Sequence, residues 1–284
     1  MSHNPTIAVL LTCHNRKEKT LQCLHALYAQ QGLDVDFNIE VFLVDDASID
    51  GTATAIENQF PLVNIISGNG DLYWNQGMRL AWKTATEAKD YDFYFWLNDD
   101  TILDINALEN LIEIYKKATT LEQKEVLVTA ACRAGLDEDY FSYGGRTDAG
   151  AVLPNGELQS CKYINGNAVL IPKAIFKELG ILSNDYTHGM GDFDYGLRAL
   201  EAGFKSFTTR DYIATCPTNE GIPGWCNPSL PLKKRWALFH SPLGLNINEY
   251  IKFRKKFWGI RWISFTIKAY AKMINPQLYN KISQ

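Results

Sequence analysis

The sequence lacks the features that mark membrane-spanning and exported proteins. No run of about 18 uncharged apolar residues occurs in the 284 residues, so a membrane-spanning helix is not expected. Residues Met1 to Pro5 contain neither a basic patch nor an apolar core segment, so this end does not resemble a signal peptide. These absences predict a cytoplasmic protein.

Cysteine is sparse and unpatterned. The six cysteines are scattered along the chain, and no two of them form a C-x-x-C pair. In a chain of this size without an export signal, free thiols are expected rather than a disulfide framework. A zinc site is not indicated either.

The glycine-rich loops that bind phosphates are missing or incomplete. No G-x-x-x-x-G-K-[S/T] stretch occurs, which excludes a P-loop. Gly68 and Gly70 begin a G-x-G-x-x-G pattern, but residue 73 is Tyr, and the first predicted strand-to-helix turn, Thr12 to Arg16, holds no glycine. A dinucleotide-dependent dehydrogenase is therefore a weak alternative.

Charge is distributed unevenly along the chain. From Lys233 to Gln284 there are eleven basic residues and one acid (+10), whereas the remaining 232 residues carry 17 basic and 31 acidic side chains (−14). Four prolines, at 217, 223, 228 and 231, precede the change. The break predicts a main domain over 1–232, with halves at about 1–101 and 102–232, and a basic C-terminal helical extension over 233–284.

Apolar runs of strand length alternate with helical segments in the first hundred residues. The predicted strands are 6–12, 39–44, 62–66 and 94–97, and the predicted helices include 17–30 and 74–88. Such alternation is typical of right-handed βαβ units. It predicts an α/β fold with a Rossmann-like, mainly parallel sheet flanked by helices.

Acidic side chains follow two of these strands. Asp45 and Asp46 end the second, and Asn98, Asp99 and Asp100 end the fourth. In open α/β sheets ligands bind at the carboxyl ends of the strands. Each pair could instead cap a helix. Together they favour a nucleotide site, with the first pair on a base or ribose and the second holding a cation that neutralises a diphosphate.

Four ordered segments carry a resemblance to a known family: LLTCHNR, VFLVDDASIDGT, GNGDLYWNQG and WLNDD. Their order and spacing resemble those of family-2 glycosyltransferases with the GT-A fold, and most closely the bacterial rhamnosyltransferase-like members. The resemblance covers about residues 5–245. It implies an inverting transferase of bacterial surface polysaccharide synthesis that moves a sugar from a UDP- or dTDP-linked donor to a glycan or lipid-linked acceptor.

The resemblance also implies roles for individual residues near the donor. Asp46 would bind the base, supported by Asp45, and Asp100 would bind Mn²⁺ or Mg²⁺, with Asp99 near the ribose or the metal. The other residues that it implies at the donor nucleotide are Thr12, Asn15, Arg16 and Asn75. Asn98 stands where the family has the first acid of its D-x-D motif.

The second half of the chain holds a further pair of acids. Tyr163 to Pro172 is predicted to be a strand, and Asp192 and Asp194 precede a predicted helix with apolar positions at Leu197, Leu200 and Phe204. Two acids at this place suit helix capping equally well. Asp194 and Arg198 are four residues apart, which allows them to pair on one helical face.

The resemblance assigns chemistry to this segment. Asp192 would be the general base, Asp194 would orient the acceptor or the base, and Arg198 would keep both carboxylates ionised. A single base and one displacement of a metal-held diphosphate imply inversion at the sugar carbon. Gly191 stands where the family has another acid.

Four other residues are weaker candidates. By resemblance to GT-A enzymes with a C-terminal histidine ligand, His240 is a candidate for the metal, the alternative being a histidine packed in a loop. His188 and Trp225 are candidates for acceptor contact, and Trp74 for stacking on a sugar ring. Trp96 is expected in the core.

Basic and aromatic residues are interleaved from Ile251 to Lys272. Such a segment can lie on an anionic membrane, here the inner face of the cell membrane, or pack on the main domain with its charges in water. Nucleic acid is not expected. Two other functions remain open: a nucleotidyltransferase, and a sugar-nucleotide-binding but inactive subunit of a membrane assembly complex, which Gly191 and Asn98 favour.

Overall fold

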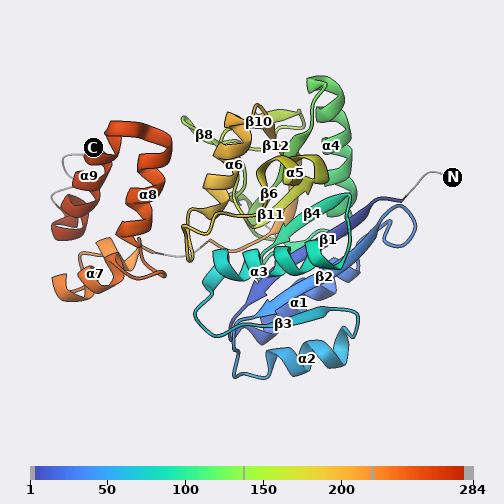
Figure 1. Cartoon of the computed structure of the whole chain (residues 1–284), viewed down its shortest axis with the longest axis horizontal. Helices are drawn as coiled ribbons and strands as arrows, with labels where there is room; N and C mark the ends of the chain where they lie inside the picture. Colours follow the sequence, from blue (N-terminus) through green and yellow to red (C-terminus); the bar gives the residue numbers. More distant parts are fainter. Residues whose placement is uncertain (1–3, 137, 219–220, 278–284) are drawn as a thin grey trace. The chain divides into compact units, whose positions relative to one another are not determined.

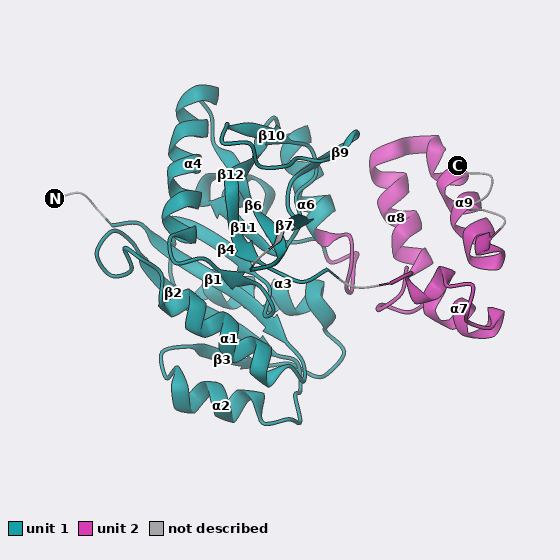
Figure 2. Ribbon diagram, turned by 180° about the vertical axis from the view of Figure 1, so that it is seen from behind, with its two compact units in different colours: residues 1–183, 192–218 teal, residues 184–191, 219–284 magenta. Residues whose placement is uncertain are grey.

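The structure is a computed structural model of the chain that describes residues 4–136, 138–218 and 221–277 (Figure 1). The expectation for Met1 to Pro5 and the end of the basic extension fall partly outside these residues. The chain divides into two compact units, residues 1–183 with 192–218, and residues 184–191 with 219–284 (Figure 2). The domain boundary at residue 232 stays a prediction.

A sheet of ten strands, counted over the described residues, lies at the centre of the first unit. Its order is β10–β12–β6–β11–β4–β1–β2–β3, with β5 on β12 and β7 on β6. The bounds are β1 Thr6–Cys13, β2 Asn38–Asp45, β3 Asn64–Ser67, β4 Phe93–Leu97, β5 Ile102–Leu103, β6 Val126–Gly135, β7 Glu138–Tyr143, β10 Gln159–Cys161, β11 Ala168–Pro172 and β12 Lys205–Thr215. A two-stranded ribbon, β8 Arg146–Thr147 and β9 Gly150–Ala151, stands apart from it.

Strands β4, β1, β2 and β3 run parallel, as do β6 and β12, and β11 is antiparallel between the two groups. Helices cover both faces of this sheet (Figure 1). The helices of the first unit are α1 Lys17–Tyr28, α2 Thr52–Gln59, α3 Tyr73–Ala88, α4 Ala107–Glu122, α5 Lys173–Leu179 and α6 Gly191–Glu201. The predicted α/β class is thereby confirmed.

Alternation along β4 explains how one strand serves both faces. Phe93, Phe95 and Leu97 join the core that includes α1 and α4, whereas Tyr94 and Trp96 join the core that includes α3 and α6. Because successive side chains of a strand point to opposite faces, an uninterrupted apolar run is what a doubly covered strand requires. The predicted core position of Trp96 is confirmed, since its side chain is fully buried.

Three predicted element bounds are wrong. Strand β11 begins at Ala168, opposite Leu97 of β4, so residues 163–167 lie outside it. Helix α6 already contains Asp192 and Asp194 in its first turn, and its Leu200 is 42% exposed rather than inward-facing. Strand β3 begins at Asn64, two residues after the exposed Leu62. For the two strands, the pairing partner rather than the apolar pattern decides where the element starts.

The second unit is helical. It contains η1 Gly224–Cys226, α7 Leu232–Phe239, α8 Ile247–Trp258, η2 Gly259–Arg261 and α9 Trp262–Ile274. A small core of Phe239, Ile247, Ala269 and Met273 holds these helices together. The predicted helical character of the C-terminal extension is confirmed over the described part.

The six cysteines are free and buried. Within residues 4–136, 138–218 and 221–277, no helix has the length and apolar character that crossing a membrane requires.

Candidate active site

The acidic pair at the end of β4 is held by an arginine from another loop. Arg16, between β1 and α1, places Nη1 2.8 Å from Asp99 Oδ1 and Nη2 3.0 Å from Asp100 Oδ2. Asp99 is buried, and its Oδ2 atom has no hydrogen-bond partner among the described residues. Burial raises the pKa of Asp99 to about 6, against the opposing effect of the Arg16 charge.

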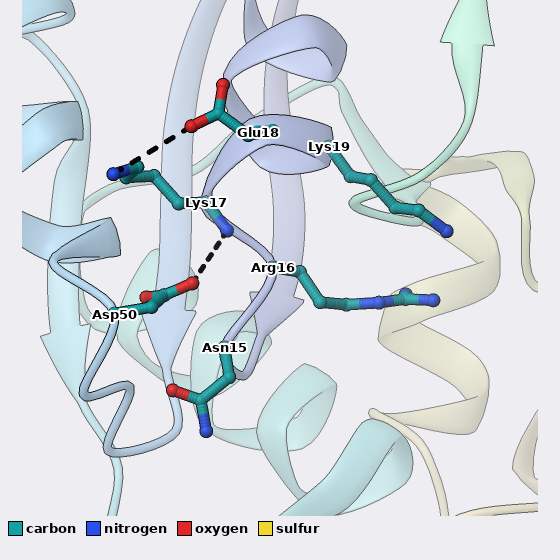
Figure 3. Close-up of a pocket in the computed structure, with 6 residues that line it drawn as sticks. All are labelled: Asn15, Arg16, Lys17, Glu18, Lys19 and Asp50. Atoms are coloured by element: carbon teal, nitrogen blue, oxygen red, sulfur yellow. Dashed lines mark hydrogen bonds and ion pairs between the residues drawn. The ribbon is translucent and has the colours of Figure 1, made fainter.

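Arg16 also lines a recess at the start of α1. The recess has a volume of about 470 Å³ and is lined by Asn15, Arg16, Lys17, Glu18, Lys19 and Asp50. Figure 3 shows the side chains of Arg16 and Lys19 extending to the same side, away from Asp50. A helix amino terminus with basic side chains is a favourable place for an anionic group.

The loop before α1 is clasped to the loop after β2. Asn15 accepts a hydrogen bond from Ile49 N–H at 2.8 Å on Oδ1, and its own N–H donates to Ser48 Oγ at 2.8 Å. Ser48 N–H in turn donates to Asp45 Oδ1 at 3.0 Å. Two of the residues predicted at the donor, Asn15 and Asp45, therefore fix the shape of this edge of the sheet.

Asp46 binds backbone amides of the loop before α3. Its Oδ1 accepts from Gly70 N–H at 2.7 Å, and its Oδ2 accepts from Leu72 and Tyr73 N–H at 2.9 and 3.1 Å. A Cβ at Gly68 would lie 2.5 Å from Asp46 Oδ1, so only glycine allows this close approach. Asp46 thus stabilises the amino terminus of α3 from a neighbouring strand.

Trp74 connects Asn98, which precedes Asp99 and Asp100, to a second loop. Its Nε1–H donates to Asn98 Oδ1 at 2.7 Å, and a Cβ at Gly166 would lie 2.4 Å from ring atom Cζ2 of Trp74. The sequence patterns do not predict this connection, although Trp74 and Asn98 both lie in segments that carry the family resemblance. The sequence feature that corresponds to this close contact is the glycine between Asn165 and Asn167.

Asp192 receives two backbone hydrogen bonds at the start of α6. Gly166 N–H donates to Oδ2 at 3.0 Å, and Phe193 N–H donates to Oδ1 at 2.8 Å. The surrounding protein disfavours the charged form more than these bonds stabilise it, which raises the pKa of Asp192 to about 6. Such a carboxyl group can accept a proton near neutral pH.

The predicted pair of Asp194 and Arg198 is confirmed, with Arg198 Nε 2.7 Å from Asp194 Oδ2. Asp194 is fully buried, and Arg198 also donates to the carbonyl oxygens of Leu179 and Ile181 at 2.9 and 3.1 Å. The pair therefore anchors α6 to the chain that follows α5. Asp192 differs from Asp194, because its hydrogen bonds come from the backbone amides of Gly166 and Phe193 and not from Arg198.

Two more residues predicted at the donor take part in packing α3. Asn75 is fully buried and donates from Nδ2 to the carbonyl oxygen of Ser183 at 2.9 Å. Thr12 of β1 faces Gly77, where a Cβ would lie 2.2 Å from Thr12 Oγ1. The Thr12 contact brings α3 close to the carboxyl end of β1, and the Asn75 bond joins α3 to the chain that follows α5.

Three of the four weaker candidates, His188, Trp225 and His240, belong to the second unit. His188 lies in the segment 184–191. His240 donates from Nδ1 to the carbonyl oxygen of Trp236 at 2.9 Å, and its ring packs on the Trp236 ring with centroids 4.5 Å apart. Trp225 packs against Phe239 in the same unit. Within the described part of the chain, no three His, Cys, Asp or Glu residues are grouped as metal ligands.

Comparisons with known proteins bear on the family and the fold of the chain. Residues 8–123 match the family model for glycosyl transferase family 2. No match was found among curated proteins.

Solved structures match almost the whole chain at low sequence identity. S. aureus TarS 1–349 in complex with UDP is 11% identical with a TM-score of 0.58, over 95% of this chain and 88% of that one. The mannosyltransferase PcManGT from Pyrobaculum calidifontis, in complex with GDP-Man and Mn²⁺, is 15% identical with a TM-score of 0.56, over 99% and 83%. At these identities the likeness concerns the fold, which is that of GT-A transferases.

Proposed function

We propose that this chain, whose residues 8–123 belong to glycosyl transferase family 2, transfers a sugar from a nucleotide-diphosphate donor to a hydroxyl group with inversion. One observation carries the proposal. Asp192 is hydrogen-bonded to Gly166, Gly166 packs on Trp74, and Trp74 is hydrogen-bonded to Asn98 beside Asp99 and Asp100. This chain of contacts sets a candidate base at a fixed position relative to a candidate cation site.

The acidic pair fits a divalent cation. Mg²⁺ and Mn²⁺ prefer oxygen ligands, and Mg²⁺ is commonly held by one or two carboxylates together with substrate phosphates. Asp99 Oδ2 is a buried carboxylate oxygen with no hydrogen-bond partner among the described residues. Asp100 and Asp99 would hold the ion, which supplies charge neutralisation for the departing diphosphate. His240 is kept as a further candidate ligand.

The residues of the first unit would divide the remaining work. Asp192 would take the proton from the acceptor hydroxyl while the oxygen of that hydroxyl attacks the anomeric carbon. Because a single base serves a single displacement, the configuration at that carbon is inverted. Arg16 would hold Asp99 and Asp100 as carboxylates, and Asp46 would position the loop before α3 against the nucleotide.

The donor and acceptor are proposed at the level of chemical class. TarS structures hold UDP or UDP-GlcNAc and PcManGT holds GDP-Man, which supports a nucleotide-diphosphate sugar here, and we favour a UDP- or dTDP-linked one. The acceptor would be a glycan or a lipid-linked hydroxyl of a bacterial surface polysaccharide, with His188 and Trp225 as candidate contacts. The protein would act in the cytoplasm, in contact with the inner face of the membrane.

The Asp192→Asn variant tests the proposal. A thermal-shift screen of nucleotide diphosphates, with and without Mn²⁺, first identifies a donor that stabilises the wild-type chain. Sugar transfer from that donor is then measured. General base catalysis contributes about 10²–10⁴-fold, so Asp192→Asn should lower transfer by at least about 10²-fold while keeping the donor-induced thermal shift.

The matched control is Asp211→Asn, which alters an exposed acid on β12. It should transfer sugar as the wild type does. Full transfer by Asp192→Asn would overturn the assignment of the base. A wild-type chain that binds the donor and never transfers or hydrolyses it would instead identify an inactive binding subunit.

A further inference from the structure

Helix α9 has two apolar faces, and within the described residues only one of them packs into a core. Ala269 and Met273 point into the core of the second unit, where they join Phe239 and Ile247. These contacts account for the inward face of the helix. A surface helix of a globular protein usually needs no second apolar face.

The second face is formed by isoleucines. Ile263, Ile267 and Ile274 of α9, together with Ile260 one turn earlier, are 42%, 63%, 54% and 77% exposed. Their spacings of three, four and seven residues place them along one side of a helix. We call these four residues the isoleucine stripe.

The surroundings of the stripe are positively charged. The chain contains no Asp or Glu after Glu249, but eight Lys and Arg residues. Arg261 and Lys268 are exposed on the same helical segment. Arg254 differs, because its guanidinium lies 4.5 Å from the ring centroid of Trp258 and 4.2 Å from that of Phe265, inside the unit.

The combination of apolar and basic groups selects among possible occupants. In a symmetric pair of chains, the basic residues beside the stripe would face each other and repel. Nucleic acid would engage basic and aromatic side chains, but would leave an isoleucine stripe without a partner. An anionic lipid surface satisfies both features, since acyl chains take the isoleucines and headgroups take the charges.

The length of α9 fits a helix that lies along a bilayer. Its 13 residues extend about 20 Å, less than the roughly 30 Å hydrocarbon core. We propose that α9 binds an anionic membrane surface, with the isoleucine stripe inserted among the lipids and Arg261 and Lys268 at the headgroups. The inference does not depend on the proposed sugar transfer.

Vesicle sedimentation with the full chain tests this surface. The probes are vesicles of phosphatidylcholine alone and of phosphatidylcholine mixed with phosphatidylglycerol. Wild-type protein should sediment with the anionic vesicles only, and added salt should weaken this binding. Ile263→Ser/Ile267→Ser should reduce it about tenfold or more, because the inserted apolar area is lost. Arg261→Gln/Lys268→Gln should reduce binding to the anionic vesicles as well.

The matched control is Leu62→Ser/Leu121→Ser, which removes from the first unit two leucines that are more exposed than Ile263 and Ile267. It should sediment as the wild type does, and all variants should keep the wild-type melting temperature. Equal sedimentation of the wild type and the stripe variant would overturn the proposal. So would a wild-type dimer that the stripe variant converts to a monomer without any vesicle binding.

Discussion

At Asp192, burial and hydrogen bonding act on the pKa in opposite directions. Two backbone N–H groups stabilise the carboxylate, yet the enclosure of the group by protein has the larger effect and raises the pKa to about 6. Asp99, with one carboxylate oxygen on Arg16, has its pKa raised to about 6 as well. The two groups would affect different steps, because one is proposed to accept a proton and the other to bind a cation.

The raised pKa of Asp192 predicts the acid side of the pH–rate profile. Only the carboxylate can accept the acceptor's proton, so kcat should fall about tenfold per pH unit below about pH 6 and level off above it. An unperturbed Asp would place this fall near pH 4. The measurement is kcat at saturating donor, acceptor and cation between pH 5 and 8, chosen around the value of about 6.

A second measurement over the same pH range separates the contributions of Asp99 and Asp192. Cation affinity measured by calorimetry over this pH range reports on Asp99, because protonation would compete with the ion. If cation affinity falls toward low pH while kcat does not change with pH, the pH dependence belongs to Asp99. That result would count against Asp192 as the base.

At the scale of elements, loops that are far apart in sequence meet at the carboxyl end of the sheet. Asp46 after β2 holds the loop before α3, and the first turn of α3 presents Trp74 to both Asn98 and Gly166. Helix α3 thus links the triplet after β4 to the loop before β11.

Gly166 is predicted to tolerate no side chain while Trp74 is present. The Cβ of Gly166→Ala would lie 2.4 Å from the Trp74 ring, so the loop that binds Asp192 must shift. Overpacking of this kind costs about 1–3 kcal/mol in the free energy of unfolding. We expect about a tenfold or greater loss in kcat, with little change in the donor-induced thermal shift.

The double variant Gly166→Ala/Trp74→Ala provides the control. Removing the indole opens the space that the new methyl group needs, so the double variant should be no worse than Trp74→Ala alone. Additive losses would show that the steric contact is not what positions Asp192. Trp74→Phe, which keeps a ring but loses the hydrogen bond to Asn98, measures the contribution of that bond.

Local sequence patterns predict strands and helices, but they do not predict which loops contact each other. Apolar periodicity predicted the strand at 94–97 and its acidic end, because a doubly covered strand must be apolar throughout. The ion pairs of Arg16 and the bonds of Asp46 could not be predicted, since they join loops separated by 83 and by 24 or more residues. The strand predicted from Tyr163 fails for the same reason: Gly166 donates its N–H to Asp192 instead of to a neighbouring strand.

At the scale of the whole molecule, the segment before Asp192 belongs to a different unit from Asp192 itself. Residues 184–191 group with 219–284, whereas Asp192 begins the next part of the first unit. Within the second unit, Glu249 of α8 accepts hydrogen bonds from Thr187 N–H at 3.0 Å and from Thr187 Oγ1 at 2.7 Å. The segment that precedes Asp192 in the sequence is therefore hydrogen-bonded to α8.

The bonds from Thr187 predict that Glu249 affects kcat. Glu249→Ala removes both bonds to Thr187, which loosens the segment leading to Asp192, and hydrogen bonds to charged groups contribute about 1.5–3 kcal/mol. We expect about a tenfold loss in kcat and an unchanged donor-induced thermal shift. The control is Lys252→Ala, which removes an exposed ion pair to Asp185 of 3.8 Å and should stay within about twofold of the wild type. A Glu249→Ala enzyme with full kcat would show that the bonds to Thr187 do not affect the position of Asp192.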